Sequence, residues 1–147
     1  MKKTVVVLAT LDTKGQESEY LRRQVEALGG AALLVDIGVV GPPDAQPDVT
    51  REEVAEAGGT PLAELLEQPT RQKASPVMVA GATKILLGML AEGRIHAVLG
   101  LGGTQGTPNC TQVMQALPYG FPKVWSRPSR PATDSWPGRP TRTGAAP

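Results

Sequence analysis

The chain has 147 residues, of which 20% are charged, and a formal net charge of +1. This length suffices for one domain with a hydrophobic core, and the low charge argues against the basic face that a nucleic-acid partner requires. One cysteine and one histidine exclude an internal disulfide and argue against a metal site. No segment reads as a signal peptide or a membrane span, so we expect a cytoplasmic protein without nucleic-acid or membrane partners.

Apolar runs alternate with helical patterns along the chain, which predicts a three-layer, Rossmann-like open parallel sheet of the α/β class. The first run, Val5 to Ala9, is continuous and typical of a strand buried on both faces. Thr50 is placed to cap a short helix, and Ser75-Pro76 reads as a helix start. The expected strands are residues 5–9, 31–37, 95–99 and one that begins at 121. The expected helices are residues 16–28, 51–57, 75–92 and 109–117.

The most informative stretch runs from His96 to Thr107. An apolar strand there ends in four glycines within seven residues, and a helix follows. Such a loop lets a ligand approach the backbone, and the helix dipole favours phosphate or carboxylate at that point. The loop is neither a P-loop nor a dinucleotide fingerprint, and a simple strand-to-helix turn explains the same pattern. The candidate binding residues here are Gly102, Gly103, Thr104, Gly106 and Thr107.

A second candidate segment follows the first strand, at the edge where ligands of open parallel sheets bind. Asp12, Thr13 and Lys14, followed by Gly15, supply a carboxylate, a hydroxyl and an ammonium group. They suit a ribose, a magnesium ion or a phosphate, and the alternative is a helix cap beside a solvated lysine. Asp36 ends the second strand, where an acid accepts from ribose hydroxyls or caps the following turn. Because both loops lie at one edge of the sheet, we predict one composite site.

Three stretches together resemble a known family. They are VVVLATLDTKGQE (residues 5–17), EGRIHAVLGLGG (92–103), and Gly106-Thr107 with ALPYGFPKV (116–124). Over residues 3–124 the pattern resembles the N-terminal part of the ATP-binding domain shared by the tomato mosaic virus resistance protein and many uncharacterised bacterial proteins. The resemblance implies two α/β lobes and ATP, with or without Mg²⁺, as the ligand. Its plant member inhibits a viral replication protein. Thr104-Gln105 replaces the usual Ser-Gly of that family.

The resemblance stops at Val124, where that family continues with Val-Ser-Thr-Val-Ala-Ser-Gly-Asp and a second lobe. Residues 125–147 are rich in proline and arginine and hold no Val, Ile, Leu, Met or Phe, which predicts a disordered tail. Codons for residues 125–133, regrouped from the last base of the tryptophan codon, can encode that missing motif. We therefore hypothesise that the tail is an out-of-frame translation, with a natural proline-rich tail as the alternative.

These features predict a partial nucleotide-binding lobe over residues 1–124, in which the glycine loop holds phosphates and Asp12 to Lys14 close the site. Its partner would be a nucleotide or another anionic small molecule. Two further readings stay open, namely part of an enzyme that acts on a phosphorylated or carboxylated metabolite, and an inactive frameshifted product. The sequence identifies no catalytic residue, and a homo-oligomer stays open for full-length members of the resembling family.

Overall fold

The computed structural model describes residues 2–103 and 106–126. These residues form four strands and five helices, which alternate as the sequence predicts. The strands are β1 (Thr4–Ala9), β2 (Ala31–Asp36), β3 (Ala97–Leu101) and β4 (Lys123–Ser126). The helices are α1 (Leu11–Ala27), α2 (Arg51–Ala57), α3 (Leu62–Glu67), α4 (Arg71–Ala91) and α5 (Gly106–Ala116).

The four strands form one parallel sheet in the order β2-β1-β3-β4. Val7 lies at the centre, with Leu34 of β2 and Leu99 of β3 as its partners on either side. Leu99 in turn pairs with Val124 of the edge strand β4. The predicted α/β class with an open parallel sheet is confirmed, and the carboxyl ends of all four strands meet at one edge.

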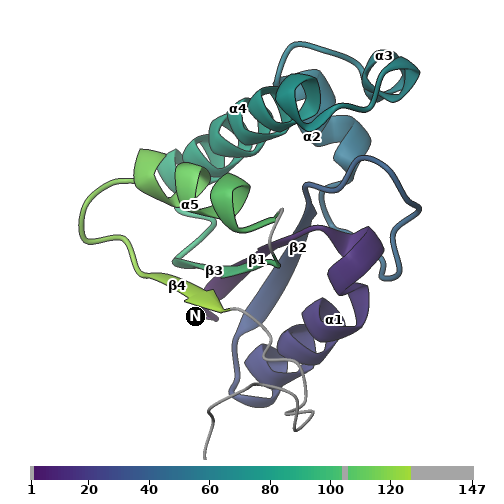
Figure 1. Ribbon diagram of the computed structural model, residues 1–147. Coiled ribbons are helices and arrows are strands. Elements are labelled where there is room, and N and C mark those ends of the chain that lie inside the picture. The colour runs from purple at the N-terminus through teal and green to yellow at the C-terminus, as the bar shows by residue number, and fades with distance from the viewer. Residues whose placement is uncertain (1, 104–105, 127–147) are drawn as a thin grey trace, which may run out of the picture.

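Helices cover both faces of the sheet and give it three layers (Figure 1). Val6 and Leu8 point to one face, where they pack with buried residues of α2, α4 and α5. Val7 and Ala9 point to the other face and pack with Leu11 at the start of α1. This alternation along one strand follows from the two-residue period of β structure.

Helix α4 has 21 residues and a mean hydropathy of 1.5, so length and composition alone would let it cross a membrane. This differs from our expectation that no segment is long enough. The helix starts at Arg71, four residues before the predicted start, because Thr70 caps it by accepting from the Lys73 N–H at 3.3 Å. One side of α4 lies in the hydrophobic core, as in the core helices of globular proteins. Its buried residues include Ala74, Met78, Ala82 and Leu86.

Strand β3 occupies residues 97–101 instead of the predicted 95–99. Gly100 therefore belongs to the strand, where a Cβ atom would collide with the end of the Met114 side chain of α5. The first glycine of the predicted loop serves close packing of a helix on the sheet. Only the glycines from Gly102 onward are left to form the loop.

Strand β4 reaches Ser126, two residues beyond the predicted limit of the folded lobe. Trp125 pairs with Gly100, and Ser126 pairs with Leu101. These two residues therefore continue the sheet, although their composition suggested a tail. The rest of the predicted disordered, out-of-frame tail, residues 127–147, lies outside the described residues.

Candidate functional site

A cavity of about 400 Å³ lies at the carboxyl edge of the sheet. Four parts of the chain line it: the start of α1, the loop after β2, the start of α4, and the junction of β3 with α5. This is the edge at which open parallel sheets bind ligands. Five residues predicted from the sequence line the cavity: Asp12, Thr13, Lys14, Gly103 and Gly106.

The two predicted loops lie next to each other on one side of this cavity. A Cβ atom built on Gly103 would lie 3.9 Å from Cε of Lys14. One built on Gly106 would lie 3.8 Å from the hydroxyl oxygen of Thr10. The Lys14 ammonium is 3.7 Å from a carboxylate oxygen of Glu17, and its side chain is 23% exposed. The structure thus joins two segments that are about 90 residues apart in sequence.

The first loop is a distorted helix start. Helix α1 begins at Leu11, where we expected a loop as far as Gly15, and it is kinked at Lys14, whose φ and ψ are −125° and 22°. The Thr10 carbonyl oxygen accepts from the Thr13 and Lys14 N–H groups at 3.2 and 2.8 Å. Gly15 is required at this kink, because a Cβ atom there would lie 2.6 Å from the carbonyl carbon of Asp44.

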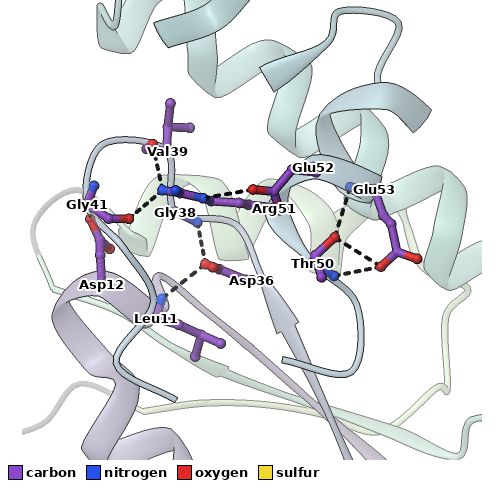
Figure 2. Close-up of polar contacts among 10 residues, drawn as sticks. All are labelled: Leu11, Asp12, Asp36, Gly38, Val39, Gly41, Thr50, Arg51, Glu52 and Glu53. Carbon is purple, nitrogen blue, oxygen red and sulfur yellow. Dashed lines mark hydrogen bonds and ion pairs between the residues drawn. The ribbon is translucent and has the colours of Figure 1, made fainter. Parts of the chain in front are cut away.

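We call residues Gly38 to Gly41 the strap; all of them except Gly41 line another wall of the cavity. Asp36 holds the near end of the strap (Figure 2). One carboxylate oxygen of Asp36 accepts from the Gly38 N–H at 2.8 Å and from the Leu11 N–H at 3.1 Å. Asp36 is only 1% exposed. Burial raises the pKa of its carboxyl group above the ordinary value, although the two backbone hydrogen bonds lower it.

Two further side chains hold the far end of the strap. Asp12 Oδ2 accepts from the Gly41 N–H at 3.3 Å. Arg51 Nη1 donates to the carbonyl oxygen of Val39 at 2.9 Å and to that of Gly41 (Figure 2). Arg51 is the first residue of α2, whose N-terminus carries a capping box formed by Thr50 and Glu53. Side chains from α1, β2 and α2 therefore fix this wall of the cavity.

Four predicted residues lie around the cavity without lining it. Asp36 accepts from the Leu11 and Gly38 N–H groups, and Gly15 packs against the backbone of Asp44. A Cβ atom on Gly102 would lie 2.8 Å from the backbone carbon of Gly106, so this glycine allows a tight turn into α5. The Thr107 hydroxyl donates to the Gly103 carbonyl oxygen and is used within that turn. Thr104, the remaining candidate, lies outside the described residues.

Sequence reasoning missed the walls of the cavity that come from the strap and from α4. Threonine is a preferred N-cap residue, so Thr70 is the signal that could have placed the start of α4 at Arg71 instead of at Ser75-Pro76. The strap gave no signal, because a loop rich in proline and glycine does not reveal which residues it will contact. The missed lining residues are Thr10, Ile37, Gly38, Val39, Val40, Pro69, Thr70, Arg71, Ala74, Ser75, Met78 and Asn109.

Cys110 lies in the first turns of α5, where the helix dipole alone would lower a thiol pKa. The side chain is instead fully buried, and burial raises its pKa to about 11. Its sulfur lies 3.5 Å from the Leu8 carbonyl oxygen. This thiol is therefore a packing group of the hydrophobic core.

Within residues 2–103 and 106–126, no three His, Cys, Asp or Glu residues gather in a way that could hold a metal ion. Asp12 contributes a single carboxylate to the cavity, and its Oδ1 atom is buried without a hydrogen-bond partner in the described structure. A magnesium ion at this edge would therefore need most of its ligands from water or from a bound phosphate.

Comparison with known proteins identifies the family of the chain. Residues 3–126 match the model of an uncharacterised protein family, the UPF0261 N-terminal domain. A UPF0261 protein of Clostridium tetani is 36% identical over 124 residues, which are 84% of this chain and 31% of that relative. UPF0261 proteins of Rhizobium meliloti and Brucella suis are 37% and 30% identical over 83% and 81% of the chain. The chain spans about 30% of the length of these relatives.

These matches correct the family expected from the sequence. The resemblance to the ATP-binding family of the tomato mosaic virus resistance protein is wrong, because the matching family model and the relatives named above are all UPF0261. The motifs that carried the resemblance fall inside the matched range, so they are motifs of the UPF0261 domain. The chain belongs to the UPF0261 family, and its residues 3–126 are the N-terminal domain of that family.

Proposed function

We propose that the cavity binds a phosphorylated small molecule, with nucleotides such as ATP as the first class to test. The observation that supports this proposal is the meeting of two loops at one cavity. Gly103 and Gly106 lie beside Lys14 and Thr10, so glycine backbone, a hydroxyl group and an ammonium group line one cavity. This combination suits the charge and the many acceptor oxygens of a phosphate.

The phosphate would lie between the start of α5 and Lys14. Helix α5 begins at Gly106 and directs its positive dipole end toward the cavity. Gly103 has no side chain to block this approach. Among the described residues, the ammonium group of Lys14 forms a partly exposed ion pair with Glu17 at 3.7 Å, which a stronger anion can displace.

The remainder of the cavity suits a larger, partly apolar body. Ile37, Val39 and Met78 line it, together with the polar side chains of Thr70 and Arg71. A cavity of about 400 Å³ falls in the range of small-molecule sites, which combine apolar walls with a few polar groups. A phosphate ester with an organic group therefore fits this cavity better than inorganic phosphate does.

Calorimetric titration of the 147-residue protein with ATP, AMP, inorganic phosphate and succinate, each with and without Mg²⁺, tests the proposal. The matched variants are Lys14→Gln in the cavity and Lys84→Gln on the exposed side of α4. We expect the nucleotides to bind more tightly than phosphate, Lys14→Gln to weaken binding at least tenfold, and Lys84→Gln to stay within twofold. Failure of every phosphate compound to bind at millimolar concentration contradicts the proposal.

The same titration distinguishes the other candidate, a site for a carboxylated metabolite of an enzyme. Binding of succinate without binding of any phosphate compound would favour that candidate. Equal loss of binding in Lys14→Gln and Lys84→Gln would place the ligand outside this cavity.

A further inference from the structure

Among residues 2–103 and 106–126, nothing covers one half of the sheet on the face that carries α1. Parallel sheets are normally buried on both faces. Helix α1 packs against β1 and β2, and it is the only helix on this face among the described residues (Figure 1). Over β3 and β4 the described structure places no helix. A hollow of about 460 Å³ lies there between α1 and the two strands.

The uncovered half presents apolar side chains. Val124 and its register partner Leu99 point to this face, because Leu99 also pairs with Val7, which packs on the α1 side. Val124 is 59% exposed, and Tyr20 on the neighbouring turn of α1 is 62% exposed. We call this surface the β3–β4 face and define it by Tyr20, Leu21, Leu99 and Val124. Leu101 lines the hollow but is itself only 2% exposed, and the polar residues at the hollow are Gln16, Glu17 and Ser126.

An open sheet edge borders the β3–β4 face. Strand β4 pairs with β3 on one side only, and no described residue pairs with its other side. Exposed apolar surface together with an unpaired strand edge is the usual mark of an interface. The match to the UPF0261 N-terminal domain ends at residue 126, which is the last residue of β4.

We infer that the β3–β4 face is the surface on which the polypeptide that follows the N-terminal domain in longer UPF0261 proteins docks. Those relatives are about three times as long as the part that this chain matches, so they have enough chain to cover it. That chain leaves the domain at the end of β4, directly beside the uncovered half. Its contact would be an apolar helix or strand, since the face carries mostly apolar side chains.

Cysteine accessibility tests this inference. Val124→Cys reports on the β3–β4 face, and Leu28→Cys is the matched control at the far end of α1, where Leu28 is 88% exposed. Each variant is made in the 147-residue chain and in a chimera in which residues 3–126 replace the matching domain of the Clostridium tetani relative. Maleimide labelling rates are measured and assigned by peptide mass spectrometry. Buried Cys110 should stay unlabelled and so reports that the domain is folded.

We expect both cysteines to react readily in the 147-residue chain. In the chimera, the Val124→Cys site should react at least tenfold more slowly, while the Leu28→Cys site changes less than twofold. Equal rates at the Val124→Cys site in the two proteins would overturn the inference. Protection of that site in the 147-residue chain that grows with protein concentration would also overturn it, because a second copy would then be the occupant.

A chimera that fails to fold would reveal itself by labelling at Cys110. In that case the same two cysteines are placed at the aligned positions of the Clostridium tetani protein itself. Protection at the position aligned with Val124, relative to the position aligned with Leu28, supports the inference. Equal labelling there contradicts it.

Discussion

The two sides of the cavity are built in different ways. On the β2 side, the side chains of Asp36, Asp12 and Arg51 hold the strap through hydrogen bonds to its backbone. On the β3 side, the Thr107 hydroxyl donates to the Gly103 carbonyl oxygen within the turn itself. The turn is also tight enough that Gly102 has no room for a side chain. The first wall is fixed by side chains from three other elements, whereas the second depends on glycines that leave no room for, or carry no, side chain. The two walls should therefore respond differently to substitution.

The largest effect on stability is expected from Asp36→Ala on the strap side. The variant leaves the N–H groups of Leu11 and Gly38 without their acceptor, at roughly 1–3 kcal/mol for each buried group. Asp36→Asn keeps an acceptor oxygen and should lose much less. Urea unfolding measures both variants. A loss for Asp36→Ala no larger than that for Asp36→Asn would mean that the strap does not depend on this carboxylate.

A comparison of wild type with Asp36→Asn tests the pKa shift of Asp36. Because burial raises the pKa of Asp36 in the folded state, its contribution to stability is fully present below the ordinary value of 3.8 and is lost as pH rises through the folded-state pKa. The difference in unfolding free energy between wild type and Asp36→Asn should therefore fall as pH rises from about 4 to 7. A difference that grows over this range would contradict the direction of the shift.

The next largest effect is expected from Gly102→Ala on the other side of the cavity. The added methyl group would lie 2.8 Å from the backbone of Gly106 and Thr107, so the turn into α5 must move. Overpacking of this kind costs about 1–3 kcal/mol. Thermal and urea unfolding measure the loss. A variant as stable as wild type would show that this turn adjusts freely.

Thr50→Ala should cost about 1 kcal/mol, because it removes the cap of α2, the helix that carries Arg51. Thr50→Ser, which keeps the hydroxyl group, is the control and should lose less than half of that amount. Urea unfolding separates the two variants. Equal losses would show that the methyl group of Thr50 matters more than its cap.

Gly103→Ala is expected to have the smallest effect on stability, within about 0.5 kcal/mol. The new methyl group meets only Lys14 Cε, at 3.9 Å, and otherwise enters the cavity. The affinity for ATP should nevertheless fall, because the added methyl group takes up space at the proposed phosphate position beside Lys14. Unfolding and ATP titration are measured on the same sample. Loss of stability without loss of affinity would make Gly103 a structural glycine like Gly102.

The sequence predicted the sheet and one side of the cavity. Val5 to Ala9 and Ala31 to Val35 are continuous apolar segments of strand length, which are typical of buried parallel strands. The meeting of Lys14 with the glycine loop followed from the rule that strand ends share an edge. The fold class therefore rested on local pattern together with one topological rule.

The strap could not be predicted, because its contacts join residues that are far apart in sequence. The bond from Leu11 to Asp36 spans 25 residues, and nothing near Asp36 distinguishes this role from ribose binding. Arg51 gives no sequence signal of its role, because the carbonyl groups that it holds lie 10 and 12 residues before it in a loop. The predicted start of α4 lies four residues too late, because Ser75-Pro76 is itself a typical helix start. In the structure Thr70 provides the cap and the helix begins at Arg71. The ligand and the origin of residues 127–147 stay predictions.

The central place of β1 has a consequence for synthesis of the chain. β1 can pair with β2 once residue 36 has been made, but its other edge waits for β3, about 60 residues later. At roughly 5–20 residues per second, the ribosome leaves that apolar edge unpaired for about 3–12 s. An unpaired apolar strand edge is prone to aggregation, so this interval exposes the nascent chain to that risk. Slowed translation between β2 and β3 would therefore lower the yield of folded protein more than slowed translation after β3.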